Sequence, residues 1–148
     1  MLIENTGRVL PFSCEQVFDV AADIERYPDY LPGWRSARII ARHSNICIVE
    51  QVLALGFLRV QIATEAVLVP PSRIDVSSSD RRFRTFSCSL QIAEAGSRGC
   101  TLTILAQLSL RSALLQQVLN QARWMSFDGI LRAYEARVQQ VYGTSGPC

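Results

Sequence analysis

The residues that could act as acids, bases, nucleophiles or metal ligands are few and scattered in this chain. The one histidine, His43, lies in the polar turn "HSN", which favours a solvated side chain. The five cysteines form no C-x-x-C pair and lack a histidine or asparagine pattern typical of a catalytic thiol. They are Cys14, Cys47, Cys88, Cys100 and Cys148. An odd number of cysteines without ligand spacing argues against a disulfide framework and a metal site, so we expect reduced thiols and no metal.

Two acidic residues in predicted strands, Glu50 and Glu65, are the candidates for proton chemistry. A carboxyl group that points into an apolar cavity has a raised pKa and can donate a proton, as a cyclase requires. By alternation Glu50 shares its face with Val52 and Ala54, so it is the better candidate, whereas Glu65 shares a face with Arg59 and is expected in solvent. These residues do not form a catalytic constellation, and we expect a protein that is not an enzyme.

Three arginines surround one aromatic residue in "RRFR", residues 81–84. This is a minimal version of the basic and aromatic patch that contacts nucleic acid or the ribosome. A solvated hairpin turn explains it equally, and so does attraction to anionic lipid. The formal charge of the whole chain is +2, which is too weak to indicate a nucleic-acid partner by itself.

The spacing of hydrophobic residues changes along the chain, and it predicts the helices and strands that must position these side chains. Residues 6–12 predict a first strand, and residues 13–24 predict a short helix that opens with a capping box of Ser13 and Gln16. The segment "DIERYPDYLPGW", residues 23–34, is turn-rich because it holds two prolines. From residue 35 to residue 110 the hydrophobic period is two, which predicts about six consecutive strands. Consecutive strands with short links form an antiparallel meander.

The remainder, from Ser112 to Tyr142, has no proline and only Gly129 as a breaker, so it predicts one long helix with Gly143 as its C-cap. A curved sheet needs a cover for its apolar face, and this helix is the only element long enough. The predicted fold is α+β, a curved antiparallel sheet of about six to seven strands wrapped around one long C-terminal helix. We expect one domain over residues 1–148, with residues 143–148 as a flexible tail.

The predicted C-terminal helix carries two apolar stripes. Large side chains form the first stripe: Trp124, Phe127, Leu131, Tyr134 and Val138. Mostly small side chains lie opposite: Leu115, Ala122, Ser126, Gly129, Ala133 and Ala136. A helix packed on a sheet by one face needs only one stripe. Three explanations stay open: a sheet that wraps far around the helix, a space for an apolar ligand, or a stripe that meets a partner or a membrane.

The chain shows no sign of secretion or membrane insertion. Its N-terminus lacks the basic and apolar regions of a signal peptide, and the uncharged stretch "GCTLTILAQLSL" is too short to span a bilayer. Hydrophobic residues make up 49% and charged residues 19%, which is typical of a globular protein. We expect a soluble protein of the cytoplasm.

Three stretches of the chain together resemble the coenzyme Q-binding proteins of the START-like superfamily. They are "VFDVAADIERYPDYLPGW", "LGFLRVQIATEAVLVPPSRI" and "AYEARVQQVYG", and the resemblance runs from about Arg8 to Gly143. The most specific points are the Y-P-x-Y-L-P run over residues 27–32, the Gly-Phe pair at 56–57 and the Tyr-Gly pair at 142–143. Bacterial members of this group are often described as polyketide cyclase/dehydrase-like proteins or ribosome-association toxins. The chain departs from the family pattern at Gly33 and Trp34, where Trp and Cys usually follow the loop proline, and at Leu90, where a Trp is common.

The resemblance implies a helix-grip fold, START/Bet v 1-like, with a deep apolar cavity between sheet and helix. Such a cavity implies non-enzymatic binding or chaperoning of a polyprenyl quinone (ubiquinone) or a similar apolar lipid in support of respiratory electron transport. No cofactor is then expected, and the quinone or lipid is a bound ligand. The protein is expected in the cytoplasm or peripherally at the inner face of the membrane. A ribosome-association toxin and a cyclase/dehydrase enzyme are the alternatives.

Ligand-binding residues are predicted in two groups. Tyr27, Tyr30, Leu31 and Trp34 form an apolar lid over the cavity mouth, or else a minor core beneath the loop. The second group is the apolar face of the strands and the helix residues opposite it: Val60, Ile62, Phe86, Leu90, Leu102, Ile104, Ala106 and Leu108, with Met125 and Gly129. Alternation determines which residues share a face, and it leaves open which face is inside.

Overall fold

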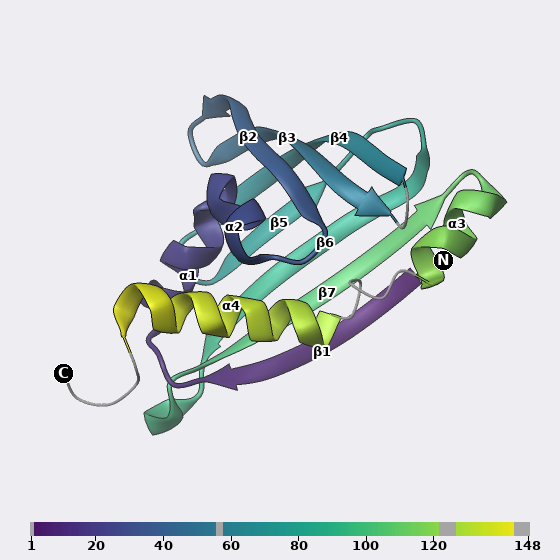
Figure 1. Ribbon diagram of the computed structural model, residues 1–148. Coiled ribbons are helices and arrows are strands. Elements are labelled where there is room, and N and C mark those ends of the chain that lie inside the picture. Colours follow the sequence, from purple (N-terminus) through teal and green to yellow (C-terminus); the bar gives the residue numbers. More distant parts are fainter. Residues whose placement is uncertain (1, 56–57, 122–126, 144–148) are drawn as a thin grey trace.

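A computed structural model describes residues 2–55, 58–121 and 127–143 of the chain (Figure 1). The strands are β1 (Leu2–Leu10), β2 (Trp34–His43), β3 (Ile46–Leu55), β4 (Leu58–Val69), β5 (Arg73–Ser77), β6 (Phe83–Glu94) and β7 (Cys100–Leu110). The helices are α1 (Cys14–Ala22), α2 (Tyr27–Tyr30), α3 (Ala113–Gln121) and α4 (Phe127–Tyr142), with short 3₁₀ turns at Ile24–Arg26 and Gly96–Arg98. None of the helices in these ranges is long and apolar enough to cross a membrane.

All seven strands form one antiparallel sheet in the order β1-β7-β6-β5-β4-β3-β2. The six consecutive strands after the first helix pair in chain order, which confirms the predicted meander, and β1 closes the other edge by pairing with β7. The sheet is curved, and α1, α2 and α4 lie on its concave side (Figure 1). The predicted α+β fold, a curved sheet around a C-terminal helix, is therefore confirmed.

The capping box predicted for the first helix is also present. The backbone N–H of Gln16 donates to Oγ of Ser13 at 3.2 Å, and the backbone N–H of Ser13 donates to Oε1 of Gln16 at 3.1 Å. Two backbone donors at the helix start are satisfied in this way. The same helix buries Val17, Phe18, Val20 and Ala21 against the rest of the core.

The predicted single helix from Ser112 to Tyr142 is wrong, because the structure has two helices, α3 and α4, on either side of residues 122–126, which lie outside the described residues. In Figure 1, α4 runs in front of β7 and β1, while α3 lies where β7 ends. Oγ of Ser112 accepts from the N–H of Leu115 at 3.2 Å at the start of α3. The absence of proline predicted helical residues correctly, but how helices divide and turn depends on packing with the sheet.

The large-residue stripe is the buried side of α4, a point that the sequence pattern leaves open. The buried residues of this helix are Phe127, Ile130, Leu131, Tyr134 and Val138, and Trp124 of the stripe lies outside the described residues. On the other side Gly129 and Ala133 are half-buried and Ala136 is exposed. Arg8 of β1 donates from Nε to Oε1 of Glu135 at 2.7 Å, which ties the edge strand to α4.

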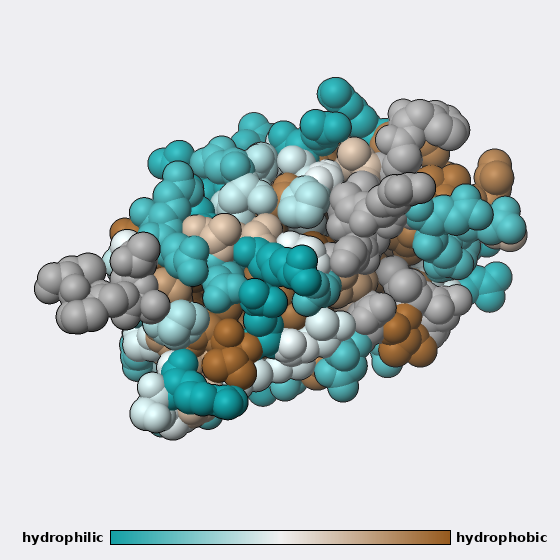
Figure 2. Space-filling model, turned by 60° about the horizontal axis from the view of Figure 1, so that its bottom comes forward, coloured by the Kyte–Doolittle hydropathy of each residue, from teal (hydrophilic) through white to brown (hydrophobic). Residues whose placement is uncertain are grey.

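Figure 2 shows the face that carries α4 and β1. Within its described part, hydrophobic residues form separate patches among hydrophilic ones. Scattered hydrophobic residues of this kind are ordinary for a protein surface.

Candidate ligand cavity

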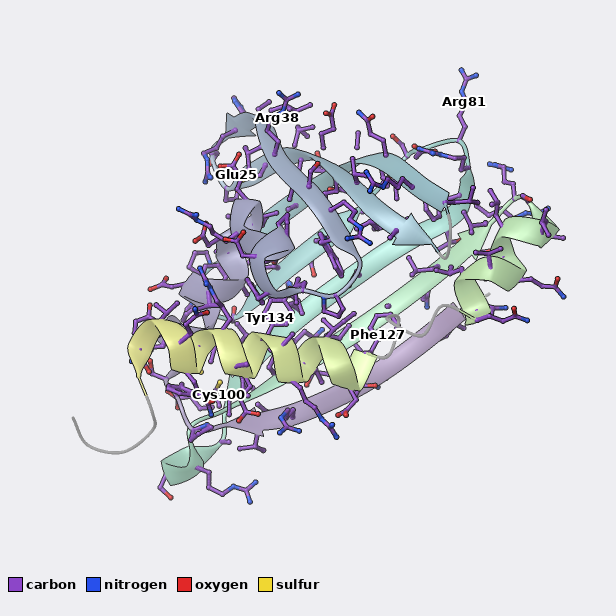
Figure 3. All side chains as sticks on the ribbon, in the orientation of Figure 1. Glu25, Arg38, Arg81, Cys100, Phe127 and Tyr134 are labelled. Atoms are coloured by element: carbon purple, nitrogen blue, oxygen red, sulfur yellow. The ribbon has the colours of Figure 1, made fainter. Side chains whose placement is uncertain are left out.

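An apolar cavity of about 120 Å³ lies between the concave face of the sheet and the helices α2, α3 and α4. Its wall consists of Tyr27, Trp34, Gln51, Leu53, Ile62, Thr64, Val76, Phe83, Phe86, Cys88, Leu90, Ile104, Ala106, Leu108, Leu110, Leu119, Phe127, Ile130 and Tyr134. Figure 3 shows Phe127 and Tyr134 on α4, the helix that lies over the concave side of the sheet. Almost every wall residue is hydrophobic, which is the usual composition of a pocket for an apolar small molecule.

Many of the predicted ligand-binding residues lie on this wall. They are Tyr27, Trp34, Ile62, Phe86, Leu90, Ile104, Ala106 and Leu108. The face chosen from the alternation is thus the concave face, because these strand side chains point to the same side of a pleated sheet. Contact of these residues with a ligand stays a prediction.

Five predicted residues lie off the wall, namely Tyr30, Leu31, Val60, Leu102 and Gly129, and Met125 lies outside the described residues. Val60 and Leu102 are buried on the predicted face, but they pack in the core beyond the cavity. Gly129 is half-buried on α4 and is not among the wall residues, and its contact with a ligand stays a prediction.

The segment predicted as a lid packs against the rest of the protein. Tyr27 and Leu31 are only 7% and 3% exposed and belong to the core. Trp34 begins β2, is half-buried and borders the cavity, while the ring of Tyr30 packs against the rings of Tyr27 and Tyr134. The segment therefore supplies both cavity wall and core, and its opening as a lid stays a prediction.

Tyr27 is the centre of an aromatic cluster at one end of the cavity. Its ring meets Tyr30, Trp34 and Tyr134 edge to face, with centroids 6.1, 6.1 and 5.8 Å away. The Tyr134 hydroxyl donates to the Tyr27 hydroxyl, which in turn donates to the carbonyl oxygen of Ala21 near the end of α1. Burial raises the pKa of Tyr27 and Tyr134 well above the ordinary value, so both phenols are neutral and their donors are used within the protein.

A short polar chain crosses the sheet at the wall of the cavity. Nε1 of Trp34 donates to Oε1 of Gln51 at 2.7 Å, and Nε2 of Gln51 donates to Oγ1 of Thr64 at 2.8 Å. Oγ1 of Thr64 then donates to the carbonyl oxygen of Val49 at 3.2 Å. Gln51 and Thr64 are 8% and 3% exposed, so both polar side chains are buried. Neither was predicted from the sequence, although a polar residue on an otherwise apolar strand face is a visible signal.

The chemistry available at the wall is limited. Burial raises the pKa of the Cys88 thiol to about 12, so this thiol stays protonated and is a poor nucleophile near neutral pH. No aspartate, glutamate or histidine is among the described wall residues. Glu50, the better of the two candidates for proton chemistry, is not on the wall, because alternation with the inward Gln51 puts it on the other face, where Arg38 Nη2 lies 3.3 Å from its Oε1. Glu65 and His43 are exposed.

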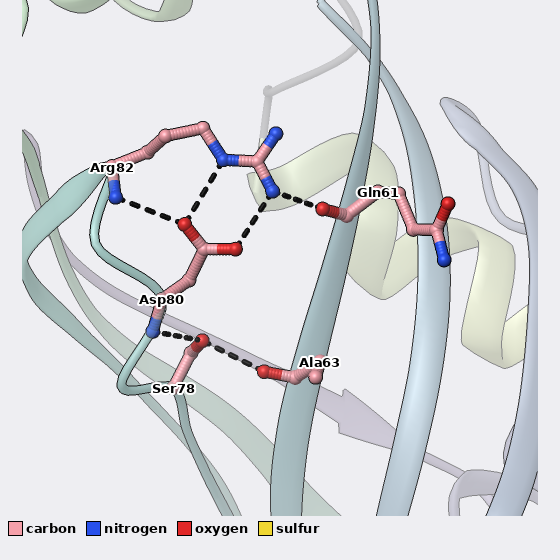
Figure 4. A network of polar contacts seen from close by, with 5 residues as sticks. All are labelled: Gln61, Ala63, Ser78, Asp80 and Arg82. Carbon is pink, nitrogen blue, oxygen red and sulfur yellow. Dashed lines mark hydrogen bonds and ion pairs between the residues drawn. The ribbon is translucent and has the colours of Figure 1, made fainter.

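The arginine-rich turn between β5 and β6 contains one arginine that serves the fold (Figure 4). Arg82 donates from Nε and Nη2 to both oxygens of Asp80, at 2.9 and 2.7 Å, and also to the carbonyl oxygen of Gln61. The guanidinium lowers the pKa of Asp80 to about 2. Oγ of Ser78 donates to the carbonyl oxygen of Ala63 at 2.8 Å. These bonds fasten the turn to β4.

The other arginines of this region border a polar surface pocket. Arg81, Arg84 and Arg111 line it together with Phe83, which also belongs to the wall of the apolar cavity. Figure 3 shows Arg81 pointing away from the sheet. All three side chains are exposed, and Nε of Arg111 donates to the carbonyl oxygen of Arg81 at 3.0 Å. No ion pair is found for these arginines among the residues that the structure describes.

Comparison with known proteins relates the chain to one family. The family model described as "Polyketide cyclase / dehydrase and lipid transport" matches residues 10–141. The ribosome association toxin RatA of Pseudomonas aeruginosa is 24% identical over 135 residues, which cover 91% of this chain and 94% of that protein.

Two solved structures are similar in fold. The protein TTHA0849 of Thermus thermophilus superposes with a TM-score of 0.80 at 19% identity, over 95% of this chain and 99% of that one. The Zhui aromatase/cyclase of a Streptomyces species has a TM-score of 0.80 at 12% identity, over 99% of each chain. At these identities the likeness is one of fold.

Proposed function

We propose, given that this chain belongs to the polyketide cyclase/dehydrase and lipid transport family, that it binds an apolar ligand in the cavity and carries it without converting it. The observation that supports this proposal is the wall itself, where hydrophobic side chains from six strands and three helices line one cavity. Removal of apolar surface from water stabilises such a complex by about 25 cal/mol per Å² and requires no charged partner.

The titratable groups of the wall favour binding over acid–base catalysis. Tyr27, Tyr134 and Cys88 all have a raised pKa, so each is neutral and a weak acid near pH 7. General acid–base catalysis works best when the pKa of the group lies near the operating pH. A carrier or chaperone is therefore favoured over a cyclase.

The size of the cavity bears on the identity of the ligand. A cavity of about 150 Å³ in another protein is known to admit benzene, and the cavity here is about 120 Å³. A space of this size suits one compact ring rather than a long chain. We propose a polyprenyl quinone as the ligand, with its head group enclosed and most of its prenyl chain outside, collected at the inner face of the membrane.

Organic extraction and mass spectrometry of the protein purified from its native host test this proposal. A quinone or another single-ring lipid, present in near-stoichiometric amount, is the expected result. The delipidated protein should also bind added quinone with saturation. A protein that carries no apolar molecule and binds none after delipidation would overturn the proposal.

A second candidate function is ribosome association, which the name of the Pseudomonas aeruginosa relative and the three solvent-facing arginines favour. Its test is co-sedimentation with ribosomal particles at low and high salt. Changing Arg81, Arg84 and Arg111 to Gln should abolish co-sedimentation. The matched control removes the same charge elsewhere by changing the exposed Arg42 and Arg59 together with Arg35. If both triple variants behave alike, binding at this turn is refuted.

A further inference from the structure

The polar groups of the cavity wall leave one amide hydrogen without an acceptor. The Tyr134 and Tyr27 hydroxyls donate to Tyr27 and Ala21 respectively. The indole N–H of Trp34 donates to Gln51. Gln51, however, has two amide hydrogens, and its bond to Thr64 uses one of them. For the second hydrogen, no acceptor is found among the residues that the structure describes.

The orientation of the Gln51 amide follows from its neighbours. An indole N–H can only donate, so the amide oxygen of Gln51 must face Trp34. The amide nitrogen consequently faces Thr64, whose hydroxyl accepts from it and donates to the carbonyl oxygen of Val49. A flipped amide would place two donors against each other. The unused group at the wall is therefore a donor.

We propose that Gln51 is the residue that determines specificity in this cavity, and that it donates its second amide hydrogen to a carbonyl oxygen of the bound ligand. The proposal rests on the proposed function and narrows the ligand class to apolar rings that carry a ketone or quinone oxygen. Gln51 is 8% exposed and its neighbours on the wall are hydrophobic, so a ligand without an acceptor leaves a buried N–H unpaired. The free-energy cost of this unpaired N–H weakens the binding of such a ligand, as in other sites built around one hydrogen bond.

The test compares two ring probes of similar shape. Tetramethyl-1,4-benzoquinone carries two carbonyl oxygens, and 1,2,4,5-tetramethylbenzene carries the same methyl groups without oxygen. The dissociation constants of both probes are measured by titration calorimetry for wild type and for the variant Gln51→Met. One hydrogen bond corresponds to a preference of about fivefold, so the hydrocarbon-to-quinone ratio of dissociation constants should fall by about that factor in the variant.

A matched control applies the same substitution on the outer face of the sheet. Gln61 is exposed on β4, and Gln61→Met should leave the ratio unchanged. If both probes bind wild type and Gln51→Met leaves their ratio unchanged, the role of Gln51 is refuted while the proposed function stands. If neither probe binds wild type, the proposed function falls, and this inference falls with it.

Because Gln51→Met also removes the partners of Trp34 and Thr64, a second measurement uses wild type alone. The infrared spectrum of the bound quinone should show one carbonyl band at lower frequency than in a hydrocarbon solvent, since a hydrogen bond weakens the C=O bond. Carbonyl bands identical to those in the solvent would refute the donation by Gln51, whatever the stability of the variant.

Discussion

Replacing Ala106 by leucine should stabilise the protein and weaken ligand binding, because this side chain borders the cavity at the middle of β7. Ala106 is 3% exposed, and the added side-chain atoms would enter a space of about 120 Å³. Three added carbon atoms at about 0.8 kcal/mol each contribute about 2.4 kcal/mol. The leucine side chain loses rotamer freedom on folding, which costs about 0.5–1 kcal/mol. The free energy of unfolding should therefore rise by about 1.5 kcal/mol.

Thermal and urea unfolding measure this gain, which corresponds to a rise of about 3–6 °C in Tm for a chain of this size. Ala66 provides the matched control, because it is 1% exposed on β4 and lies in the core but not on the cavity wall. Ala66→Leu should overpack the core and destabilise the protein by about 1–3 kcal/mol. Quinone titration of both variants then shows whether Ala106→Leu alone blocks the ligand while raising Tm.

Opposite signs for the two substitutions are the expected pattern. If Ala106→Leu destabilises the protein as much as Ala66→Leu does, Ala106 borders packed core instead of a cavity. In that case the reasoning from the cavity to an apolar ligand is refuted as well.

Three further predictions concern the wall, a turn and the pH dependence. Trp34→Ala should speed quinone release more than it lowers Tm, because the half-buried ring borders the cavity; a large fall in Tm with unchanged release kinetics would assign Trp34 to the core alone. Gly99→Ala should destabilise the protein in urea unfolding far more than Gly96→Ala, since its Cβ would lie 2.1 Å from the carbonyl oxygen of Leu10, while Gly96 has nothing within 4 Å; equal losses would contradict this. Because burial raises the Cys88 pKa from 9.0 to about 12, the folded state retains this proton while the unfolded state loses it, so stability should fall as pH rises between these values. Urea unfolding from pH 8 to 11 should show a shallower fall for Cys88→Ala, and an unchanged slope would contradict the raised pKa.

The hydrophobic pattern of the sequence predicted the strands and which side chains share one face of the sheet. Ile104, Ala106 and Leu108 alternate with residues on the other side of β7, and all three lie on the cavity wall. A period of two is a property of the extended backbone itself, so it can be seen without any partner. The capping box of Ser13 and Gln16 is local in the same way, because both residues lie in one helical turn.

Tertiary structure alone decided how the helices divide and which polar residues meet. The single helix predicted over residues 112–142 is two helices in the structure. A spacing of 3.6 residues predicts helical residues, but it does not say where one helix ends or how each helix lies on the sheet. Glu50 and Gln51 are adjacent in sequence, yet only Gln51 faces the cavity, since the pairing of β3 with its neighbours decides which face is concave. The bond from Trp34 to Gln51 joins two neighbouring strands, and the contact of Tyr27 with Tyr134 joins elements far apart in the chain. Local patterns carry no information on such contacts, which arise only when the sheet curves and closes around its core.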